Sequence, residues 1–286
     1  MSSTQINWDK VLVSLRSTDC SLAEFCLRHP LKALDFALAK YLGSQREVKA
    51  DLAWGDQLSV VLPDVVSRLL YRYGKYETDM TSFLISELTQ GHCFVDIGAH
   101  IGYFSLLASR LVGSSGKILA FEPTPRTRHV LRQNLQNQNN CDIMSCAAWA
   151  ETSELTFKDY GWRYSAYNGF SDQRLGEVAA KDYLVRAHCA DDIIEHGNLS
   201  PDFIKIDVEA AELFVLKGLK RTLQRHSPIV TAEVGDYTPG APKSSETVIF
   251  MESFGYEPFE FVDGRLQKHN RKDRYKFDNL IFKKQS

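Results

Sequence analysis

The chain has 286 residues and a formal net charge of −2, so it lacks the basic field with which proteins hold nucleic acid. Hydrophobic residues make up 44% of it and charged residues 24%, which excludes a disordered chain. At this length we expect one large domain or two small ones, with a core that needs no metal or disulfide.

The sequence lacks the patterns expected of a transmembrane helix and of a secretory signal. The longest stretch without Asp, Glu, Lys or Arg, residues 97–109, is too short for a transmembrane helix. The first ten residues lack the basic segment and apolar segment of a secretory signal. The six cysteines are scattered without zinc spacing, which is typical of reduced thiols. We therefore expect a cytoplasmic protein with no integral membrane segment.

Residues 1–90 predict a helical and hairpin extension ahead of a second domain. Loose alternation in residues 48–62, around the turn Trp54-Gly55-Asp56, predicts a β-hairpin. Apolar residues at three- and four-residue spacing predict amphipathic helices in residues 11–16, 22–27, 31–42 and 79–88.

Residues 91–286 predict an α/β domain. Apolar runs predict strands at residues 93–97, 117–121, 142–147, 203–206 and 229–234, and helical patterns lie between them, among them residues 101–111, 126–136 and 209–223. This alternation is typical of a parallel sheet with helices on both faces. Residues 256–262 and 275–282 are joined without a helix, so that pair must be antiparallel. We expect a Rossmann-like, doubly wound, mostly parallel seven-stranded sheet whose last strand is antiparallel.

A glycine-rich turn follows the first strand of this domain. It reads D-x-G-x-x-x-G, with Asp96, Gly98 and Gly102. Glycines there let a ligand approach the backbone, and the next helix offers its N-terminal amides. The pattern lacks the third glycine of dinucleotide enzymes, and a P-loop motif does not occur. A tight turn that binds nothing is the alternative interpretation.

A second signal lies twenty residues beyond Gly102, where Glu122 ends the second strand. A carboxylate at that position can accept hydrogen bonds from ribose hydroxyls. Together the turn and the acid indicate a cofactor that contains a nucleoside. A cofactor without phosphates, such as S-adenosylmethionine, fits best because Asp96 would repel a phosphate.

Five motifs occur in order between residues 71 and 282: YGKYE from Tyr73, FVDIGAHIGYFS from Phe94, AFEP from Ala120, FIKIDVEAAEL from Phe203 and PIVTAEV from Pro228. In this order they resemble the FkbM family of S-adenosylmethionine-dependent methyltransferases. The resemblance implies an enzyme that takes a methyl group from S-adenosyl-L-methionine. It also implies O-methylation of a hydroxyl on a sugar, glycolipid or polyketide-like acceptor.

The resemblance also implies roles for single residues. Glu122 would hold the ribose, Ala147 would lie near the adenine, and Tyr76 and Glu77 would close over the cofactor. His100 stands where the family more often has Asn. The implied cofactor-binding set is Glu77, Asp96, Gly98, Ala99, His100, Gly102, Glu122 and Ala147.

Two segments depart from the family pattern. Ala210 stands where the family usually has Gly, which changes the backbone freedom beside Asp207. Cys189-Ala-Asp-Asp192 stands where Thr-Leu-Asp-Asp is usual, a change that packing alone could explain.

Methyl transfer asks for an acceptor oxygen placed in line with the methyl group. A base within hydrogen-bond reach of that oxygen increases the reaction rate about 10²–10⁴-fold. Asp207, which ends the fourth strand, and Glu209 after it are the catalytic candidates, with a structural role as the alternative. Glu212 fits better as a negative charge at a helix N-terminus.

A divalent cation is a further possibility at this edge. Asp207 and Glu233, at the end of the fifth strand, could together offer it oxygen ligands. A metal is nevertheless not expected.

Three other functions stay open at this point. An N- or C-methyltransferase is one, although Ile206-Asp-Val-Glu differs from the Asn/Asp-Pro-Pro-Tyr turn of enzymes that methylate base nitrogens. An NAD-dependent oxidoreductase is disfavoured by the glycine pattern. The third is a catalytically inactive module that keeps the cofactor fold. We expect a small-molecule or glycan acceptor and leave the oligomeric state open.

Overall fold

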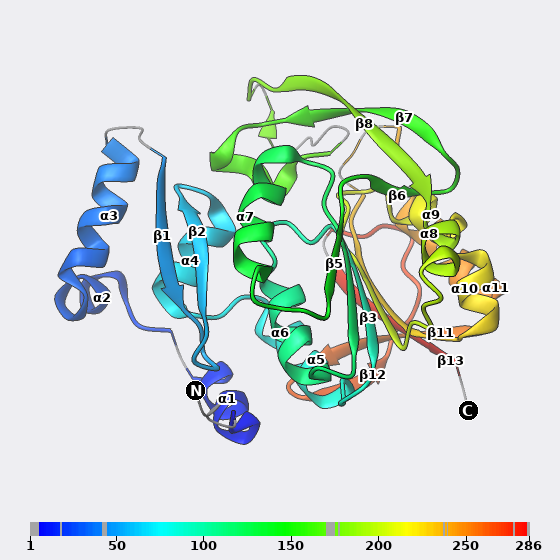
Figure 1. Ribbon diagram of the computed structural model, residues 1–286, viewed down its shortest axis with the longest axis horizontal. Helices are drawn as coiled ribbons and strands as arrows, with labels where there is room; N and C mark the ends of the chain where they lie inside the picture. The colour runs from blue at the N-terminus through cyan, green and yellow to red at the C-terminus, as the bar shows by residue number, and fades with distance from the viewer. Residues whose placement is uncertain are drawn as a thin grey trace. The chain divides into compact units, whose positions relative to one another are not determined.

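The computed structural model describes residues 6–17, 19–41, 45–169, 175–176, 178–236, 238, 240–276 and 278–284. The chain divides into two compact units (Figure 1). The N-terminal unit comprises Met1–Ser86 and Gly161–Ala166, and the C-terminal unit comprises Glu87–Tyr160 and Tyr167–Ser286. Each unit has its own fold and is described separately.

The N-terminal unit contains the predicted helices and hairpin. The hairpin pairs Arg46 with Leu62 and Asp51 with Gln57 in antiparallel register. Asp64 links the unit's parts, because its carboxylate caps α4 through Ser67 N and accepts a hydrogen bond from the Ser165 hydroxyl, 2.9 Å away. The elements are α1 (Trp8–Leu15), α2 (Leu22–Arg28), α3 (Pro30–Tyr41), β1 (Arg46–Asp51), β2 (Gln57–Leu62), α4 (Val65–Tyr73), α5 (Thr78–Glu87) and the short 3-10 helix η1 (Trp162–Tyr167).

The C-terminal unit is built on an eight-stranded sheet of order β12-β11-β13-β10-β9-β3-β4-β5. The strands β5, β4, β3, β9 and β10 are parallel, and β13 is antiparallel to both β10 and β11. The predicted Rossmann-like sheet is thus confirmed, with β12 as an eighth strand at its edge. The strands are β3 (Cys93–Ile97), β4 (Lys117–Phe121), β5 (Cys141–Met144), β9 (Phe203–Ile206), β10 (Ile229–Val234), β11 (Tyr256–Val262), β12 (Arg265–Lys268) and β13 (Asp278–Lys284).

Helices cover both faces of this sheet. In Figure 1, α6 (Tyr103–Val112) and α7 (Pro125–Leu135) lie on one face. The other face carries α8 (Ala190–His196), α9 (Glu212–Lys217), α10 (Lys220–Arg225) and α11 (Ser244–Ser253).

The single helix expected over residues 209–223 is wrong, because the chain forms α9 and α10 instead. Gly218 separates them and packs against the Trp149 carbonyl, where an added Cβ would lie 1.7 Å from the oxygen. The buried Asp191 carboxylate then caps α10 by accepting hydrogen bonds from Arg221 N and Thr222 N at 2.8 and 2.9 Å. The departure at Cys189–Asp192 therefore lies in a segment with a structural role.

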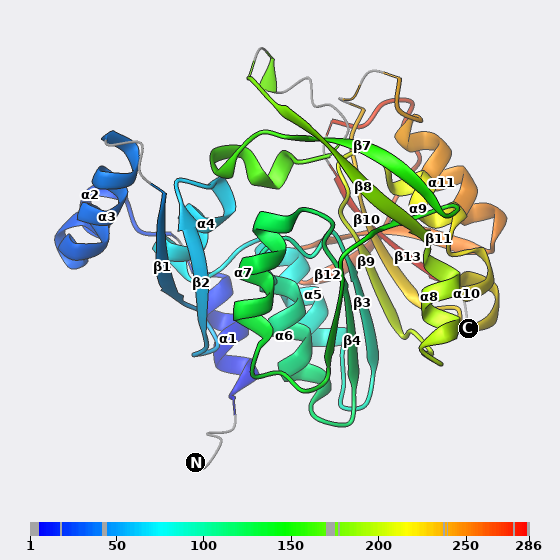
Figure 2. The ribbon, with the colours of Figure 1, turned by 45° about the horizontal axis from the view of Figure 1, so that its top comes forward.

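A second sheet interrupts the α/β pattern after β5. It contains β6 (Ala147–Trp149), β7 (Ser153–Asp159) and β8 (Lys181–Cys189) in the order β6-β8-β7. Figure 2 shows β7 and β8 as long paired strands outside the main sheet. The strand expected at residues 142–147 is therefore too long, since β5 ends where β4 ends and Ala147 pairs with Ala187 of β8.

The core of the main sheet is apolar on both faces, as central parallel strands require. Val95, Ile97, Ile204 and Ile206 are all buried in it. One row across three neighbouring strands breaks this rule. Asp96 of β3 is paired in register with Lys205 of β9, and Lys205 with Thr231 of β10, and all three are buried. We call these three residues the polar row.

Candidate functional site

The parallel strands bring most of the predicted site residues to one edge of the C-terminal unit. Their carboxyl ends meet there, which is where open α/β sheets bind ligands. The turn from Gly98 to Gly102 follows β3, and Glu122 follows β4. Asp207 follows β9, and Glu233 lies near the end of β10. We call this the carboxyl edge.

Two predicted residues do not follow a strand of the main sheet. Ala147 is buried at the start of β6. Glu77 belongs to the N-terminal unit, where it precedes α5 with a φ of 40°. Their contacts with a cofactor stay predictions.

The glycines of the turn are required by the protein itself. Gly98 has a φ of 88°, and a Cβ there would lie 1.8 Å from the Asp207 carbonyl oxygen. Gly102 has a φ of 92°, and a Cβ there would lie 2.6 Å from Leu131 Cδ1. The turn is therefore pressed against the loop after β9 and against α7. This is a second reason for the glycines beside the expected approach of a ligand.

Glu122 is 6% exposed and ties the turn to α7. Its carboxylate accepts hydrogen bonds from His100 N at 2.9 Å, Thr124 N at 2.8 Å and the Thr127 hydroxyl at 2.7 Å. A carboxylate has about four acceptor positions, so these three bonds leave one for a ligand hydroxyl.

Asp96 is 1% exposed and only half satisfied. Its Oδ2 accepts a hydrogen bond from the Ser105 hydroxyl at 2.6 Å, whereas Oδ1 has no hydrogen-bond partner among the described residues. Burial raises the pKa of Asp96, and the charge of Lys205 opposes that rise only in part. The end of β3 thus contains a buried oxygen suited to a positively charged ligand group.

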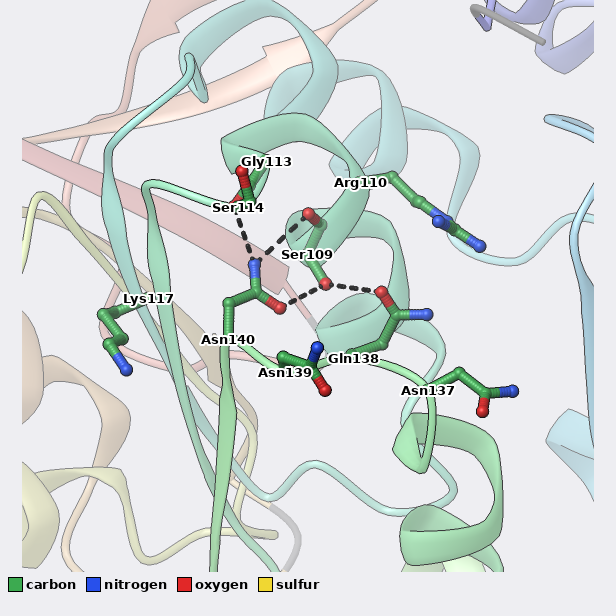
Figure 3. A pocket seen from close by; sticks show the side chains of 9 residues that line it. All are labelled: Ser109, Arg110, Gly113, Ser114, Lys117, Asn137, Gln138, Asn139 and Asn140. Carbon is green, nitrogen blue, oxygen red and sulfur yellow. Dashed lines mark hydrogen bonds between the residues drawn. The ribbon is translucent and has the colours of Figure 1, made fainter. Parts of the chain in front are cut away.

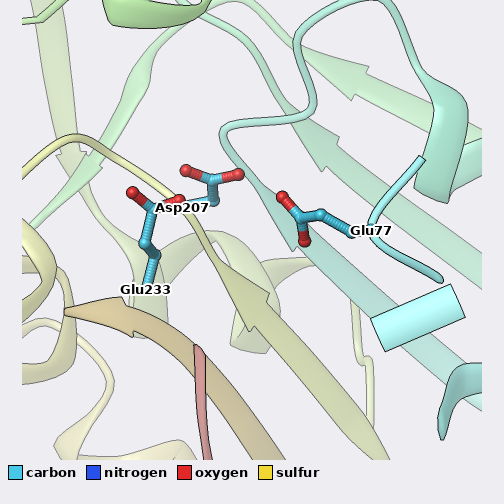
Figure 4. A group of neighbouring side chains, drawn as sticks. All are labelled: Glu77, Asp207 and Glu233. Atoms are coloured by element: carbon cyan, nitrogen blue, oxygen red, sulfur yellow. The ribbon is translucent and has the colours of Figure 1, made fainter. Parts of the chain in front are cut away.

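Asp207 lies in a different environment. Its side chain is 24% exposed, and Lys205 Nζ lies 2.8 Å from Oδ2. Glu233 is close by, with carboxylate oxygens of the two residues within 4.8 Å of one another (Figure 4). Burial alone would raise the pKa of Asp207, but the Lys205 charge, the hydrogen bond from Lys205 and the side-chain interaction with Glu233 hold it below its usual value. Asp207 is therefore an ionised carboxylate.

The loop after Asp207 is strained. Glu209 and Ala210 have φ values of 54° and 71°, which non-glycine residues adopt rarely. The Glu212 carboxylate accepts hydrogen bonds from Ala210 N at 3.2 Å and from Val208 N at 3.4 Å. Burial raises the pKa of Glu212 to about 7. Its role extends beyond the predicted interaction with a helix N-terminus, since it holds the catalytic candidates' loop.

The family model of the methyltransferase FkbM domain matches residues 96–258, more than half of the chain. The chain belongs to the FkbM methyltransferase family. Members of this family are S-adenosylmethionine-dependent methyltransferases. The matched segment begins at Asp96 and extends past Glu233, so it includes the whole carboxyl edge of the FkbM domain.

Curated relatives of the FkbM domain are also named as methyltransferases. Methyltransferase sdnD of Sordaria araneosa is 29% identical over 177 residues, which cover 48% of this chain and 68% of that protein. Hexuronic acid methyltransferase AglP of Haloferax volcanii is 26% identical over 151 residues, which cover 52% of this chain and 58% of that protein. The chain therefore spans between 58% and 68% of the length of these two relatives.

Among solved structures, methyltransferase FkbM from Methylobacillus flagellatus KT is similar to the chain with a TM-score of 0.45 and 16% identity. The match covers 96% of this chain and 58% of that one.

The carboxyl edge of the FkbM domain fits S-adenosylmethionine. The cofactor carries a positive sulfonium and a positive amino group, and it has no phosphate. The Asp96 Oδ1 atom, which has no hydrogen-bond partner among the described residues, complements a cation, and the remaining acceptor position of Glu122 suits a ribose hydroxyl. The same carboxylates would repel the pyrophosphate of NAD.

Two residues of this edge were not singled out from the sequence as part of the chemistry. Lys205 is one, although a lysine inside a buried parallel strand, FIKI, is a signal that needs an explanation. Glu212 is the other, since its contacts depend on the loop conformation. Of the two catalytic candidates, Asp207 is held at the carboxyl edge by its contact with Lys205. Glu209 lies in the strained loop after β9, two residues beyond Asp207.

A cavity of about 320 Å³ lies away from this edge (Figure 3). It adjoins Lys117 at the start of β4, about 13 Å along the strand from its carboxyl end. The Ser109 hydroxyl forms hydrogen bonds with Asn140 at 2.7 Å and Gln138 at 3.1 Å there. These bonds join α6 to the turn before β5, and no predicted site residue lines the cavity. Its lining is Ser109, Arg110, Gly113, Ser114, Lys117, Asn137, Gln138, Asn139 and Asn140.

None of the helices in the described part of the chain is both long enough and apolar enough to cross a membrane.

Proposed function

We propose that this chain transfers the methyl group of S-adenosylmethionine to a hydroxyl oxygen of a sugar-like acceptor. The observation that carries the proposal is Asp207, an ionised carboxylate held by Lys205 at the carboxyl edge of an FkbM domain. The similarity to AglP, which is named a hexuronic acid methyltransferase, supports a sugar as the acceptor class.

In the proposed reaction Asp207 accepts the proton of the acceptor hydroxyl. S-Adenosylmethionine, when bound, supplies a methyl group that is already activated for transfer. Because the hydroxyl is a poor nucleophile, a base at hydrogen-bond distance increases the rate of transfer about 10²–10⁴-fold. Asp207 is suited to this role because its neighbours keep it ionised at neutral pH.

The cofactor half of the proposal rests on the turn after β3. Gly98, Ala99, His100 and Gly102 would line the methionine part, with Asp96 Oδ1 facing a positive group. The remaining acceptor position of Glu122 would take a ribose hydroxyl. The proposal also keeps Ala147 near the adenine and Glu77 at the cofactor, and it includes no metal.

The first experiment measures S-adenosylhomocysteine binding to the purified chain by titration calorimetry, with NAD as the control. We expect one site per chain and no heat with NAD. Methyl transfer from labelled S-adenosylmethionine to hexuronic acid glycosides follows, with the product analysed by NMR for a methoxy group. Binding without transfer to any hydroxyl acceptor would favour the inactive module, and a methyl group on nitrogen or carbon would contradict O-methylation.

The ribose assignment is tested by Glu122→Gln, whose amide NH₂ can no longer accept. We expect the Kd for S-adenosylhomocysteine to rise about tenfold, since a hydrogen bond to a charged group is lost. Thr127→Val is the matched control, because it removes one of the internal bonds of Glu122 and leaves the carboxylate in place. Equal effects of the two variants would show that Glu122 acts through the fold alone.

A further inference from the structure

Lys205 occupies a position where a charge is costly. It is 4% exposed in the middle of the polar row, on β9, between the parallel strands β3 and β10. An ammonium ion in such a place destabilises the fold unless its charge is compensated. The neighbours of Lys205 therefore identify the groups that its charge stabilises.

Three groups of the C-terminal unit compensate this charge. Asp207 Oδ2 lies 2.8 Å from Lys205 Nζ, and the Phe104 ring centre lies 4.8 Å from it. Asp96 is the third, because the charge of Lys205 also acts on its carboxyl from the neighbouring strand. Of these three groups, Asp207 combines direct contact with exposure to solvent.

The main chain of Asp207 is fixed independently of Lys205. Asp207 N donates a hydrogen bond to Ile97 O at 2.9 Å, and Gly98 packs against the Asp207 carbonyl oxygen. The end of β3 thus places the backbone, and Lys205 places the carboxylate. Without Lys205 the carboxylate would lose its charged partner at 2.8 Å.

We propose that Lys205 is a positioning residue of the methyl transfer, which holds the Asp207 carboxylate in one orientation at the carboxyl edge. This inference rests on the proposed function, in which Asp207 takes the proton of the acceptor. The charged and titratable groups around Asp207 that belong to the C-terminal unit include Lys205, Glu233, His100, Asp96 and Glu212. Of these, Lys205 and His100 are the ones that can carry a positive charge, and Lys205 forms the direct bond.

The test compares Lys205→Met with Lys217→Met. Lys217 also lies over a phenylalanine ring, with Nζ 5.5 Å from the centre of Phe214, but on the surface of α9. We expect Lys205→Met to lower kcat about 10²-fold, the effect of misplacing a reacting group by about 1 Å. The KM for the acceptor and the Kd for S-adenosylhomocysteine should stay unchanged. Lys205→Arg should restore part of kcat, and Lys217→Met should leave all three constants unchanged.

A double-mutant cycle separates positioning from a general structural role. In the Asp207→Asn background, Lys205→Met should cause no further loss of kcat, because Lys205 acts through Asp207. Losses that multiply, or a loss of cofactor binding in Lys205→Met, would overturn the inference. If Lys205→Met does not fold, Lys205→Arg and Lys205→Gln carry the same comparison.

The failure of this inference differs from the failure of the proposed function. A wild-type chain that transfers no methyl group overturns both. An active wild type with full kcat in Lys205→Met overturns the positioning role alone. An active Asp207→Asn variant removes Asp207 from the reaction and the role of Lys205 with it.

Discussion

The end of β3 and the loop after β9 lie next to each other at the carboxyl edge, and the aspartates there have opposite pKa shifts. Asp96 is 1% exposed, and its pKa is raised by burial. The Asp207 side chain is 24% exposed, and its pKa is lowered by Lys205 and Glu233 against the effect of burial. Both carboxyls respond to the same ammonium, that of Lys205.

Direct contact and burial decide this difference. Lys205 bonds to Asp207 at 2.8 Å, whereas the hydrogen bond of Asp96 comes from a neutral serine, Ser105. A full charge at hydrogen-bond distance outweighs the desolvation of a half-buried carboxylate, and a hydroxyl does not outweigh it for a buried one. Two aspartates at neighbouring strand ends therefore have different pKa values, because their burial and their hydrogen-bond partners differ. We infer that Asp96, at the end of β3, is suited to a positively charged ligand group, whereas Asp207, after β9, is the carboxylate that stays ionised.

The largest expected effect separates the two aspartates. Asp207→Asn should lower the rate of methyl transfer about 10²–10⁴-fold, because the base is lost. Its Kd for S-adenosylhomocysteine should stay unchanged. Asp96→Asn should do the reverse and raise that Kd about tenfold, because an amide cannot replace a carboxylate opposite a charged group. Calorimetry and labelled-methyl transfer measure the two effects on the same preparations.

Asp142→Asn, on the exposed side of β5, is the control for both substitutions. If Asp207→Asn and Asp96→Asn have the same effects on kcat and on the Kd for S-adenosylhomocysteine, the two aspartates do not have separate roles in base catalysis and cofactor binding.

The contact between the two loops gives the next largest effect. Gly98→Ala places a Cβ 1.8 Å from the Asp207 carbonyl oxygen at a φ of 88°. We expect a loss of about 4 kcal/mol in the free energy of unfolding, from the clash and the backbone strain together. Chemical denaturation of the whole chain measures it.

Gly255→Ala is the matched variant, because Gly255 has a φ of 79° and nothing within 4 Å of an added Cβ. It should cost only the left-handed strain, about 1 kcal/mol. Similar losses in both variants would show that the close packing of the two loops contributes little.

The sequence predicted the scaffold of these loops because strands and helices have periods that can be read from apolar residues. The existence of β3, β4, β9 and β10 as parallel strands and the antiparallel end of the sheet follow from such patterns and from connection lengths, whereas the order of the strands in the sheet comes from the structure. The placement of Asp96, Glu122 and Asp207 at one edge follows from the same topology. The family resemblance, confirmed by the family model, identified the enzyme class.

The sequence could not predict what each carboxylate contacts. The three hydrogen bonds of Glu122 and the caps from Asp191 and Glu212 depend on turns that no period encodes. The break between α9 and α10 depends on a contact with Trp149, more than sixty residues away. Lys205 was visible as a charge in an apolar strand, but its partner became identifiable only in the structure.

Glu212 offers a pH-dependent test of the loop after β9. Its pKa in the folded chain is about 7, raised from the usual 4.5 by burial. Between these two values the folded state binds more protons than the unfolded state, so the free energy of unfolding falls as the pH rises from 4.5 to 7. Glu212→Gln removes this titration. Relative to wild type, the variant should gain about 3 kcal/mol over that pH range.

Denaturation of both proteins at pH 5, 6, 7 and 8 measures the difference. A difference that stays constant with pH would mean that Glu212 titrates normally and that its bonds to Val208 and Ala210 do not depend on a buried charge. Glu246→Gln, in the first turn of α11, is the control for a glutamate near a helix start.

The smallest effect concerns the residue at which this chain departs from its family. Ala210 has a φ of 71°, where a non-glycine residue costs about 1–2 kcal/mol. Ala210→Gly removes that strain but adds freedom to the unfolded chain, so we expect a net gain of about 0.5 kcal/mol in the free energy of unfolding. Ala211→Gly, at a φ of −110°, has no strain to relieve and should lose about 1 kcal/mol. Opposite signs at adjacent alanines would confirm that the loop after β9 is held strained. A lower free energy of unfolding in both variants would mean that Glu212 and the neighbouring turn impose no strain at Ala210. The glycine that is usual in the family at this position would then have another role.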